Sequence, residues 1–378
     1  MSWEKVKLGD VTDSCLGKML DQAKNRGDYQ PYLANVNVRW GSFDLDNLSE
    51  MRFLDSEEER YGLKYGDLII CEGGEPGRCA IWKEQVPNMK IQKALHRVRV
   101  HDCLDYRYLY YWFLLAGYQK ALDQYFTGAT IKHMPGDKLK SIIIDMPPLK
   151  TQHRIASILS AYDDLIENNQ KQIKLLEEAA QRLYKEWFVD LRFPNYENTP
   201  VVDGVPEGWD KISLAEIAPI LTGKKDANFG TDDGQYPFFT CAQEPIKAPS
   251  YSFDCNAVIL AGNGDFNVKL YRGKFEAYQR TYIFSPNDSE HLYLLFHSVR
   301  ENMRQLFQGA SGSTIKFLTK RMLEDIMVFV PNDEILVKYN RSCEAYQCKI
   351  ECLKSQIIIA QEARDRLLPK LMSGELEV

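Results

Sequence analysis

The stretch Gly128–Met134 is "GATIKHM", and the stretch Gly312–Leu318 is "GSTIKFL". The shared Thr-Ile-Lys recurs at a shift of 184 positions, and matches at this shift continue without a gap as far as Leu183. A shift of 206 aligns "WEKVKLGDV" from Trp3 with "WDKISLAEI" from Trp209. This period is much longer than the roughly 20 to 50 residues of a solenoid repeat. The sequence therefore predicts a tandem duplication of a domain plus a helix.

The overall composition is that of an ordinary globular protein. The chain has 378 residues, of which 44% are hydrophobic and 26% charged, so we expect two or three domains, each with its own core. An N-terminus without an apolar signal core, and the lack of an 18-residue apolar stretch, predict a cytoplasmic protein with no membrane contact. The nine cysteines are scattered without CxxC pairs, which indicates reduced thiols and no metal site.

Each half ends in a long segment in which apolar residues recur at alternating steps of four and three. This is the heptad pattern of a coiled coil, and the residues off the seam are mostly polar. We predict two helices that pack on each other, although helices packed only on their own domains would show a similar stripe. The first predicted seam includes Ile155, Leu159, Tyr162, Ile166, Ile173, Leu176 and Leu183, and the second includes Tyr346, Ile350, Leu353, Ile357 and Leu367.

The globular parts mix short β-rich runs with short helical patterns, without strict βαβ alternation. This predicts an α+β fold, with two similar mixed α/β domains joined by the two helices. Chain length permits either helix orientation, but a pseudo-twofold repeat makes the helices antiparallel and places the domains at opposite ends. The predicted boundaries are 1–148 for the first domain, 149–191 for the first helix, 192–208 for a linker, 209–331 for the second domain and 332–378 for the second helix.

Catalytic motifs are missing from the sequence. "DMPPL" at Asp145–Leu149 lacks the aromatic residue that would stack on a flipped base, and its prolines suit the first turn of the following helix. "GNGDF" at 262–266 is a glycine turn, which alone is weak evidence of phosphate binding. We find no HExxH, GxSxG or Walker motif. The chain is therefore expected to be non-catalytic.

The formal net charge of -6 does not suggest a nonspecific DNA-binding protein. Basic residues nevertheless occur among aromatic and amide residues in "KIQKALHRVR" (90–99) and "FNVKLYRGKFEAYQRT" (266–281). Such mixtures can contact phosphates and base edges. They are equally consistent with strands whose outer faces are solvated.

Three stretches together carry a family resemblance. They are "PPLKTQHRIASILSAYDDLIENNQKQIKLLEEAAQRLYKEWF" (147–188), "PEGW" (206–209) and "RLLPKLMSGEL" (366–376). With the duplicated domains between them, the chain resembles the specificity subunit of Type I restriction-modification systems over essentially its whole length. The second helix departs from this pattern, because "PNDEILVKYN" lacks the Gln-His-Arg-Ile start of the first.

The resemblance implies a specific function. Each globular domain is expected to be a target recognition domain that reads one half of a split, asymmetric DNA sequence, while the coiled coil sets the gap between the halves. It also implies two modification subunits and two restriction subunits as partners. The cofactors S-adenosylmethionine, ATP and Mg are expected on those partners and not on this chain.

Two groups of candidate DNA-contacting residues follow. Residues present in both halves are expected to share a role such as phosphate contact or anchoring of the helix: Lys18, Thr130, Lys132, Lys224, Thr314 and Lys316. Base-reading residues are expected where the halves differ: Arg78, Gln92, Lys93, Asn263, Lys269, Gln279 and Arg280. The main alternative is a non-catalytic coiled-coil scaffold whose domains bind proteins and not DNA. A standalone DNA enzyme is disfavoured by the missing catalytic motifs.

Overall fold

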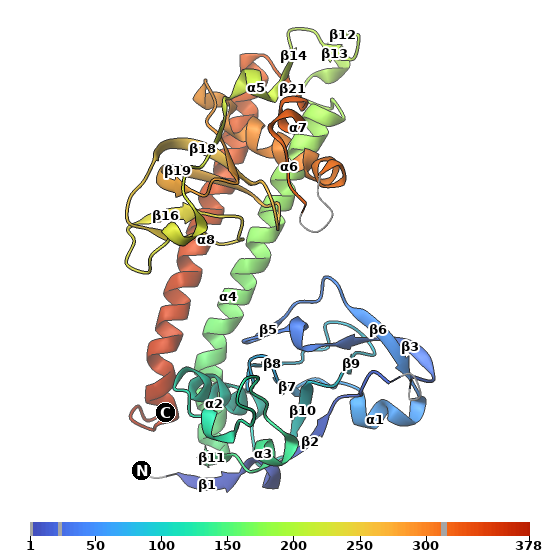
Figure 1. Ribbon diagram of the computed structural model, residues 1–378, viewed down its shortest axis with the longest axis vertical. Helices are drawn as coiled ribbons and strands as arrows, with labels where there is room; N and C mark the ends of the chain where they lie inside the picture. The colour runs from blue at the N-terminus through green and yellow to red at the C-terminus, as the bar shows by residue number, and fades with distance from the viewer. Residues whose placement is uncertain (1–2, 22–24, 311–315) are drawn as a thin grey trace. The chain divides into compact units, whose positions relative to one another are not determined.

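The computed structural model describes residues 3–21, 25–310 and 316–378, and the chain divides into two compact units. The first unit comprises the chain up to Asn168 together with the segment from Gln356 onward. The second unit comprises Asn169–Ser355. Each unit therefore contains a globular part and a segment of each long helix, α4 (Leu149–Tyr184) and α8 (Asp333–Met372) (Figure 1).

The globular part of the first unit is built on a four-stranded antiparallel sheet with the order β2-β10-β7-β8. A three-stranded sheet, β6-β3-β9, and the two-stranded pairs β1-β11 and β4-β5 accompany it. The strands are β1 (Glu4–Lys7), β2 (Thr12–Leu16), β3 (Asp28–Leu33), β4 (Val38–Arg39), β5 (Ser42–Phe43), β6 (Ser49–Phe53), β7 (Leu68–Cys71), β8 (Cys79–Ile81), β9 (Lys90–Ile91), β10 (Leu95–Val100) and β11 (Ile143–Met146). The helices are α1 (Glu58–Tyr61), α2 (Tyr106–Tyr118) and α3 (Gly136–Lys140).

Strand β7 is buried on both faces. Side chains alternate across a strand, and Leu68 and Ile70 enter the core beneath α2, while Ile69 and Cys71 enter a second core with Trp82. Helix α2 is held at its start because the Asp105 carboxylate accepts hydrogen bonds from the first turn. This double burial explains why "LIIC" is a continuous apolar run.

The second unit has a six-stranded sheet with the order β15-β20-β18-β19-β16-β17. Helix α6 packs on β18 and β19, and the pairs β14-β21 and β12-β13 lie outside the sheet. The strands are β12 (Val201–Val202), β13 (Val205–Pro206), β14 (Asp210–Ser213), β15 (Ile220–Thr222), β16 (Tyr236–Phe239), β17 (Ile246–Ala248), β18 (Phe253–Ala261), β19 (Val268–Ala277), β20 (Thr281–Phe284) and β21 (Met327–Val330). The helices are α5 (Leu214–Ile217), α6 (Leu292–Gly309) and α7 (Lys320–Glu324).

The predicted duplication is visible in strand register. In the first unit Glu4 pairs with Met146, and in the second unit Asp210 pairs with Val330. These pairs are related by the shifts of 206 and 184 that align the two halves of the sequence. The strand order β2-β10-β7-β8 likewise corresponds to β15-β20-β18-β19. The two globular parts therefore share one topology.

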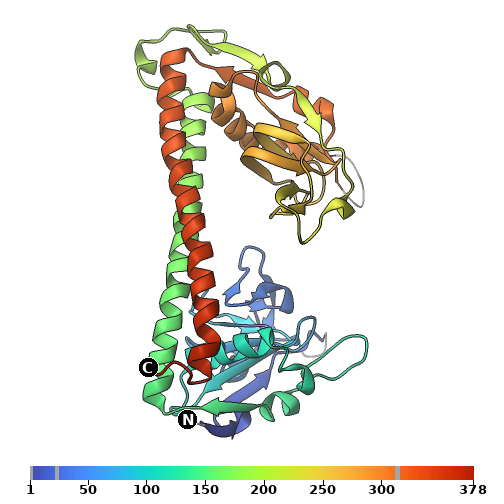
Figure 2. The ribbon, with the colours of Figure 1, turned by 90° about the vertical axis from the view of Figure 1, so that its left-hand side faces the viewer.

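The long helices are antiparallel within each unit. In the first unit, Ile155 near the start of α4 shares a buried core with Leu371 near the end of α8. In the second unit, Tyr184 at the end of α4 shares a core with Tyr339 near the start of α8. Figure 2 shows the two helices side by side in each unit. All the predicted seam residues named above are buried or half-buried.

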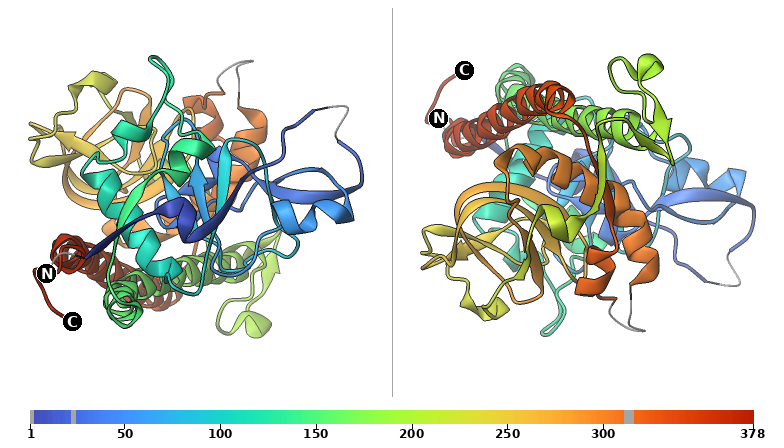
Figure 3. Two further views of the ribbon diagram at one scale, coloured as in Figure 1. Left: turned by 90° about the horizontal axis from the view of Figure 1, so that it is seen from below. Right: turned by 90° about the horizontal axis from the view of Figure 1, so that it is seen from above.

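The ends of the long helices differ from the prediction by a few residues. Helix α4 begins at Leu149, as predicted, but its α-helical part ends at Tyr184 and a π-helical turn follows at Lys185–Val189. In that turn Phe188 packs against Trp209, with ring centroids 5.5 Å apart. Figure 3 shows the end of α8 close to the start of β1 in the first unit. Within residues 3–21, 25–310 and 316–378, no helix has the length and apolar character needed to cross a membrane.

Candidate nucleic-acid interface

In the first unit, the chain after β2 passes close to the chain after β9, at a point we call the first corner (Gly17, Lys18, Gln92 and Lys93). A Cβ on Gly17 would lie 2.4 Å from the backbone oxygen of Gln92, so only glycine fits. The backbone N–H of Lys93 donates to the Lys18 carbonyl at 2.8 Å. Ala94 has φ of 87°, a left-handed conformation that costs about 1–2 kcal/mol. The corner is therefore tightly constrained, and it presents the half-exposed side chains of Gln92 and Lys93.

The structure corrects the prediction for Lys18. Its side chain is only 3% exposed, and its ammonium lies 2.5 Å from the Glu57 carboxylate. The same nitrogen donates to the backbone oxygen of Arg52 at 2.9 Å and lies 5.0 Å from the centroid of the Phe53 ring. An ammonium that is buried and paired in this way does not reach a phosphate. Lys18 anchors the corner, and we remove it from the DNA-contact set.

The second unit contains the same backbone arrangement, which we call the second corner (Gly223, Lys224, Lys225, Gln279 and Arg280). A Cβ on Gly223 would lie 2.2 Å from a backbone oxygen of the facing chain. The backbone N–H of Gln279 donates to the Lys225 carbonyl at 2.9 Å. Lys224, Gln279 and Arg280 are exposed. The two corners therefore share the close approach at a glycine and one backbone hydrogen bond, but they carry different exposed side chains.

The sequence alignment of the two corners is displaced by one residue in the structure. Lys18 was aligned with Lys224, but the isolated β-bridge of the second corner is formed by Lys225. Lys225 lies over the Phe229 ring at 4.4 Å, as Lys18 lies over Phe53. Lys225 is thus the structural counterpart of Lys18. The exposed Lys224 keeps its predicted role as a candidate phosphate contact.

Arg78 lies in the turn between β7 and β8, and its guanidinium is already engaged. It contacts the Glu75 carboxylate at 2.9 Å and donates to the backbone oxygen of Asn35 at 3.2 Å, with the side chain 18% exposed. Trp40 donates to the same glutamate at 2.8 Å. Because these partners hold the guanidinium within the turn, Arg78 is a weaker base-reading candidate than the corner residues.

The corresponding turn of the second unit carries a polar network. Cys241 donates to the Asn263 side-chain oxygen at 2.7 Å. The Lys269 ammonium donates to the Ala242 carbonyl at 2.8 Å and to the side chain of Asn267. Partial burial lowers the pKa of Lys269. Asn263 and Lys269 thus lie together, as candidates for one surface, but both have intramolecular partners.

The repeated Thr-Ile-Lys phrase lies beside these turns. Gly73 forms an antiparallel bridge with His133, and Asn263 forms the equivalent bridge with Phe317. The residue that follows the phrase, His133 or Phe317, therefore adjoins the end of the same strand, β7 or β18, in each unit. Thr314, a predicted contact, lies outside the described residues.

The two repeated lysines are exposed but not free. The Lys132 ammonium lies 3.2 Å from the Asp123 carboxylate, and the Lys316 ammonium lies 4.1 Å from the centroid of the Phe307 ring. Thr130 is exposed. Pairing of this kind on a surface is weak, so both lysines remain candidates for phosphate contact.

In each unit, the corner lies next to the turn that follows β7 or β18. The backbone N–H of Glu72 donates to the Ala94 carbonyl at 2.8 Å in the first unit, and that of Gly262 donates to the Arg280 carbonyl at 2.8 Å in the second. These bonds join the ends of neighbouring strands of the main sheet. In each unit these bonds therefore bring the corner and the turn, which are distant in sequence, next to each other.

Sequence analysis missed two arginines beside the first corner. Arg26 and Arg60 line a hollow of about 580 Å³ together with Lys93, and both are exposed. The Arg60 guanidinium lies 5.3 Å from the centroid of the Tyr61 ring. No sequence pattern links these positions, because Arg26 precedes β3, Arg60 lies in α1, and Lys93 follows β9. They add positive charge where Gln92 and Lys93 are presented.

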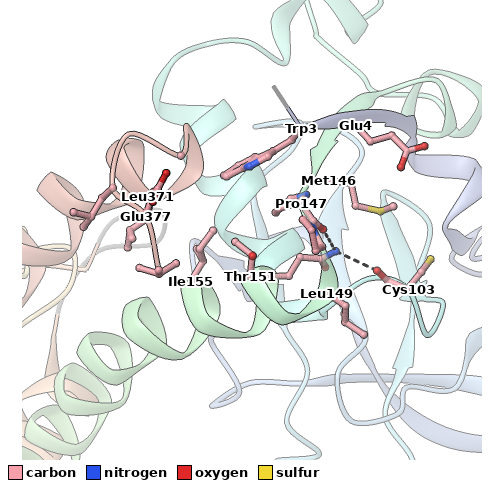
Figure 4. Close-up of a pocket in the computed structure, with 15 residues that line it drawn as sticks. Trp3, Glu4, Cys103, Met146, Pro147, Leu149, Thr151, Ile155, Leu371 and Glu377 are labelled. Carbon is pink, nitrogen blue, oxygen red and sulfur yellow. Dashed lines mark hydrogen bonds between the residues drawn. The ribbon is translucent and has the colours of Figure 1, made fainter. Parts of the chain in front are cut away.

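Gln152 belongs to the Gln-His-Arg-Ile stretch, and its side-chain hydrogen bonds anchor the start of α4 to the first globular part. The residue is 1% exposed. Its amide donates to the carbonyls of Pro147 at 2.8 Å and Cys103 at 3.2 Å, and Figure 4 draws these two bonds as dashed lines. Its oxygen accepts from the backbone N–H of Asp105 at 2.9 Å. The second helix lacks this stretch and has Leu336 at the aligned position.

A cavity of about 930 Å³ opens beside this helix start. Figure 4 shows that Trp3, Ile155 and Leu371 contribute to its lining, which is chiefly apolar. A catalytic pocket normally has several convergent polar groups. The cavity is therefore better explained by the packing of the chain termini against α4 than by chemistry.

Large pKa shifts occur among residues packed in the cores. Burial lowers the pKa of His297 to about 3, and its ring contacts the Tyr339 hydroxyl at 2.7 Å. Burial likewise raises the pKa of Tyr184 to about 12. Catalytic groups would show such shifts in an open cleft. Here the shifts are explained by packing.

The fold and the surface patches together define a class of protein: two similar mixed α/β recognition units, each with its own polar corner, connected through a pair of long helices. The family model described as Type I restriction modification DNA specificity domain matches residues 1–178 and 206–350. The chain belongs to this family. The resemblance seen in the sequence is thereby confirmed.

Relatives carry the same description. The HindI specificity subunit of Haemophilus influenzae is 38% identical, with 99% of each chain covered. The EcoDI specificity subunit of Escherichia coli is 38% identical over 178 residues, which is 46% of this chain but only 39% of that protein. The MjaIX specificity subunit of Methanocaldococcus jannaschii is 28% identical over 344 residues, covering 83% of this chain and 78% of the relative.

A solved structure confirms the fold. The S subunit of a Type I restriction-modification system from M. genitalium superposes with a TM-score of 0.57 at 16% identity. The match covers 98% of this chain and 96% of that one. The predicted fold class, with two repeated mixed α/β parts and two long helices, is therefore correct.

Proposed function

We propose that this chain is the DNA-recognition subunit of a Type I restriction-modification complex and carries no catalytic residues of its own. Each unit reads one half of a split, asymmetric target. The observation that carries this proposal is the pair of corners. They share the close approach at a glycine and one backbone hydrogen bond, but present Gln92 and Lys93 in one unit and Gln279 and Arg280 in the other. Two half-sites of different sequence need different hydrogen-bonding side chains.

The proposed partners are double-stranded DNA, two modification subunits and two restriction subunits, all in the cytoplasm. The internal duplication supports two modification subunits, because it offers two near-equivalent docking surfaces on one chain. S-adenosylmethionine belongs to the modification subunits, and ATP and Mg to the restriction subunits. The net charge of -6 indicates that partners supply much of the positive channel for DNA.

The long helices set the number of unread base pairs between the half-sites. Support comes from their continuity, since α4 has 36 residues and an ideal helix of that length rises about 54 Å. Their seam residues are buried or half-buried in both units. A spacer of this kind holds its length better than a flexible linker does.

Methylation mapping of genomic DNA tests the proposal. Cells co-express this chain with the methyltransferase encoded beside it, and the control cells express the methyltransferase alone. We expect methylated adenine only when this chain is present, within one split motif of fixed gap. Unchanged methylation, with the two proteins still co-purifying, would overturn sequence reading and favour the scaffold alternative.

A further inference from the structure

The repeated phrase of the first unit forms a closed loop. The backbones of Thr127 and His133 exchange two hydrogen bonds, each 2.8 Å long. Gly128 has φ of 93°, and a Cβ there would lie 2.2 Å from the backbone oxygen of Ile131. Residues 127–133 therefore form a loop of defined shape that requires glycine at 128.

Ile131 projects from this loop with 64% of its surface exposed. The ammonium of the neighbouring Lys132 lies 3.2 Å from the Asp123 carboxylate and 5.7 Å from the centroid of the Phe126 ring. Because such surface pairing is weak, Lys132 remains a candidate phosphate contact beside Ile131. Single exposed aliphatic residues are common on proteins. Ile131 differs because a loop of defined shape presents it next to a lysine that is a candidate phosphate contact.

Near the loop, the two carboxylates that line the adjoining hollow are both paired with cations. His133 bridges to Gly73, so the loop adjoins the turn that carries Arg78. The two carboxylates lining the hollow beside it, Glu75 and Asp123, are each paired with a cation, at 2.9 Å and 3.2 Å. Approaching phosphates therefore meet paired carboxylates and not free ones.

Because the phrase is repeated in both halves, we infer that it does not read individual bases. Thr-Ile-Lys occurs in both halves, whereas the corner residues differ. A contact made to two half-sites of different sequence does not depend on base identity. Insertion of an aliphatic side chain at a base step is such a contact, because it touches base faces and not the hydrogen-bonding edges that identify a base pair.

We propose that Ile131 is an apolar wedge that inserts against the base stack of the DNA held by the first unit. The proposal rests on the proposed function, which supplies the DNA. The wedge touches base faces and sugars and leaves the hydrogen-bonding edges to the corner residues. DNA is favoured over a protein partner because the neighbours in the loop, Thr130 and Lys132, are polar, whereas the centre of a protein interface is a wider apolar area.

The test uses the full chain purified with its co-expressed modification subunit. Duplexes carry 2-aminopurine at successive positions of the mapped target, so that an unstacked step is seen as increased fluorescence. We compare Ile131→Ala with Ile131→Leu, which keeps an aliphatic tip. The matched control is Val202→Ala, because Val202 is 67% exposed but lies in the β12-β13 hairpin.

We expect increased fluorescence at one step for the unmodified chain, for Ile131→Leu and for Val202→Ala, and its loss for Ile131→Ala. The dissociation constant of Ile131→Ala should rise about tenfold for target and unrelated duplexes alike, since three carbon groups lose their contact. Unchanged affinity, a changed preference at one base pair, or failure to co-purify with the modification subunit each overturns the wedge. If the unmodified complex shows no sequence preference, the proposed function falls as well.

Discussion

At the residue scale, the two corners differ most clearly at Arg280. The equivalent position of the first corner is occupied by Ala94, in a left-handed conformation. An exposed arginine at a constrained corner suits bidentate contact with a guanine edge. We expect Arg280→Ala to lose about 1–3 kcal/mol of discrimination at one base pair of the second half-site. Methylation mapping should show that position relaxed and the first half-site unchanged.

Lys224→Ala is the control for this prediction. Lys224 is exposed in the same corner and is a candidate phosphate contact. Its loss should weaken binding to all sequences alike and reduce the salt dependence, without changing the motif. A relaxed first half-site in Arg280→Ala would contradict the assignment of one half-site to each unit.

Gln152 provides a residue-scale prediction about stability. Replacement by leucine keeps a similar volume but removes three hydrogen bonds made by a residue that is 1% exposed. Buried groups left without partners should lower the free energy of unfolding by about 1–3 kcal/mol, as measured by denaturant unfolding. Lys150→Ala, at an exposed position two residues away, should change it by less than about 0.5 kcal/mol.

At the scale of elements, Glu344 ties α8 to the sheet and to α6 of the second unit. Its carboxylate contacts the Arg272 guanidinium at 2.8 Å and the Tyr293 hydroxyl at 2.7 Å. These contacts, Arg272 first, lower the pKa of Glu344 to about 2. A folded-state pKa below the unfolded value adds stability above the unfolded pKa, and this stability is lost as pH falls toward 2.

We therefore expect the free energy of unfolding of Glu344→Gln to depend less steeply on pH between about 5 and 2 than that of the unmodified chain. Unfolding curves at several pH values measure this slope. Glu351→Gln, an exposed substitution further along the same helix, is the control and should keep the original slope. Equal slopes for all three proteins would contradict the role given to the Arg272 contact.

Elements were predicted unevenly from the sequence. The long helices begin within one residue of the predicted positions, at Leu149 and Asp333, because heptad spacing and flanking prolines are local signals. The π-helical turn at Lys185–Val189 was not predicted, since it depends on the packing of Phe188 against the distant Trp209. The order of the short strands in each sheet also depends on pairing between distant segments.

At the scale of the whole molecule, each compact unit has cores of its own. A destabilising core substitution should therefore increase amide hydrogen exchange mainly in the unit that carries it. Phe284 is fully buried in the second unit, and Phe284→Ala should cost about 3–5 kcal/mol. We expect faster amide hydrogen exchange, followed by mass spectrometry, mainly within Asn169–Ser355. Leu109→Ala in the core of the first unit is the reciprocal control. Equal acceleration in both units by either variant would show that they unfold as one.

The sequence by itself determined the duplication, the two long helices and the family, because a repeated pattern and heptad spacing are properties of neighbouring residues. It also named Gln92, Lys93, Gln279 and Arg280 as candidates, because the two similar halves differ there. Only the tertiary structure decided that Lys18 is buried against Glu57, that Arg78 is engaged within its turn, and that Arg26 and Arg60 join the first corner. Burial and pairing depend on which distant segments fold together, and no local pattern encodes that.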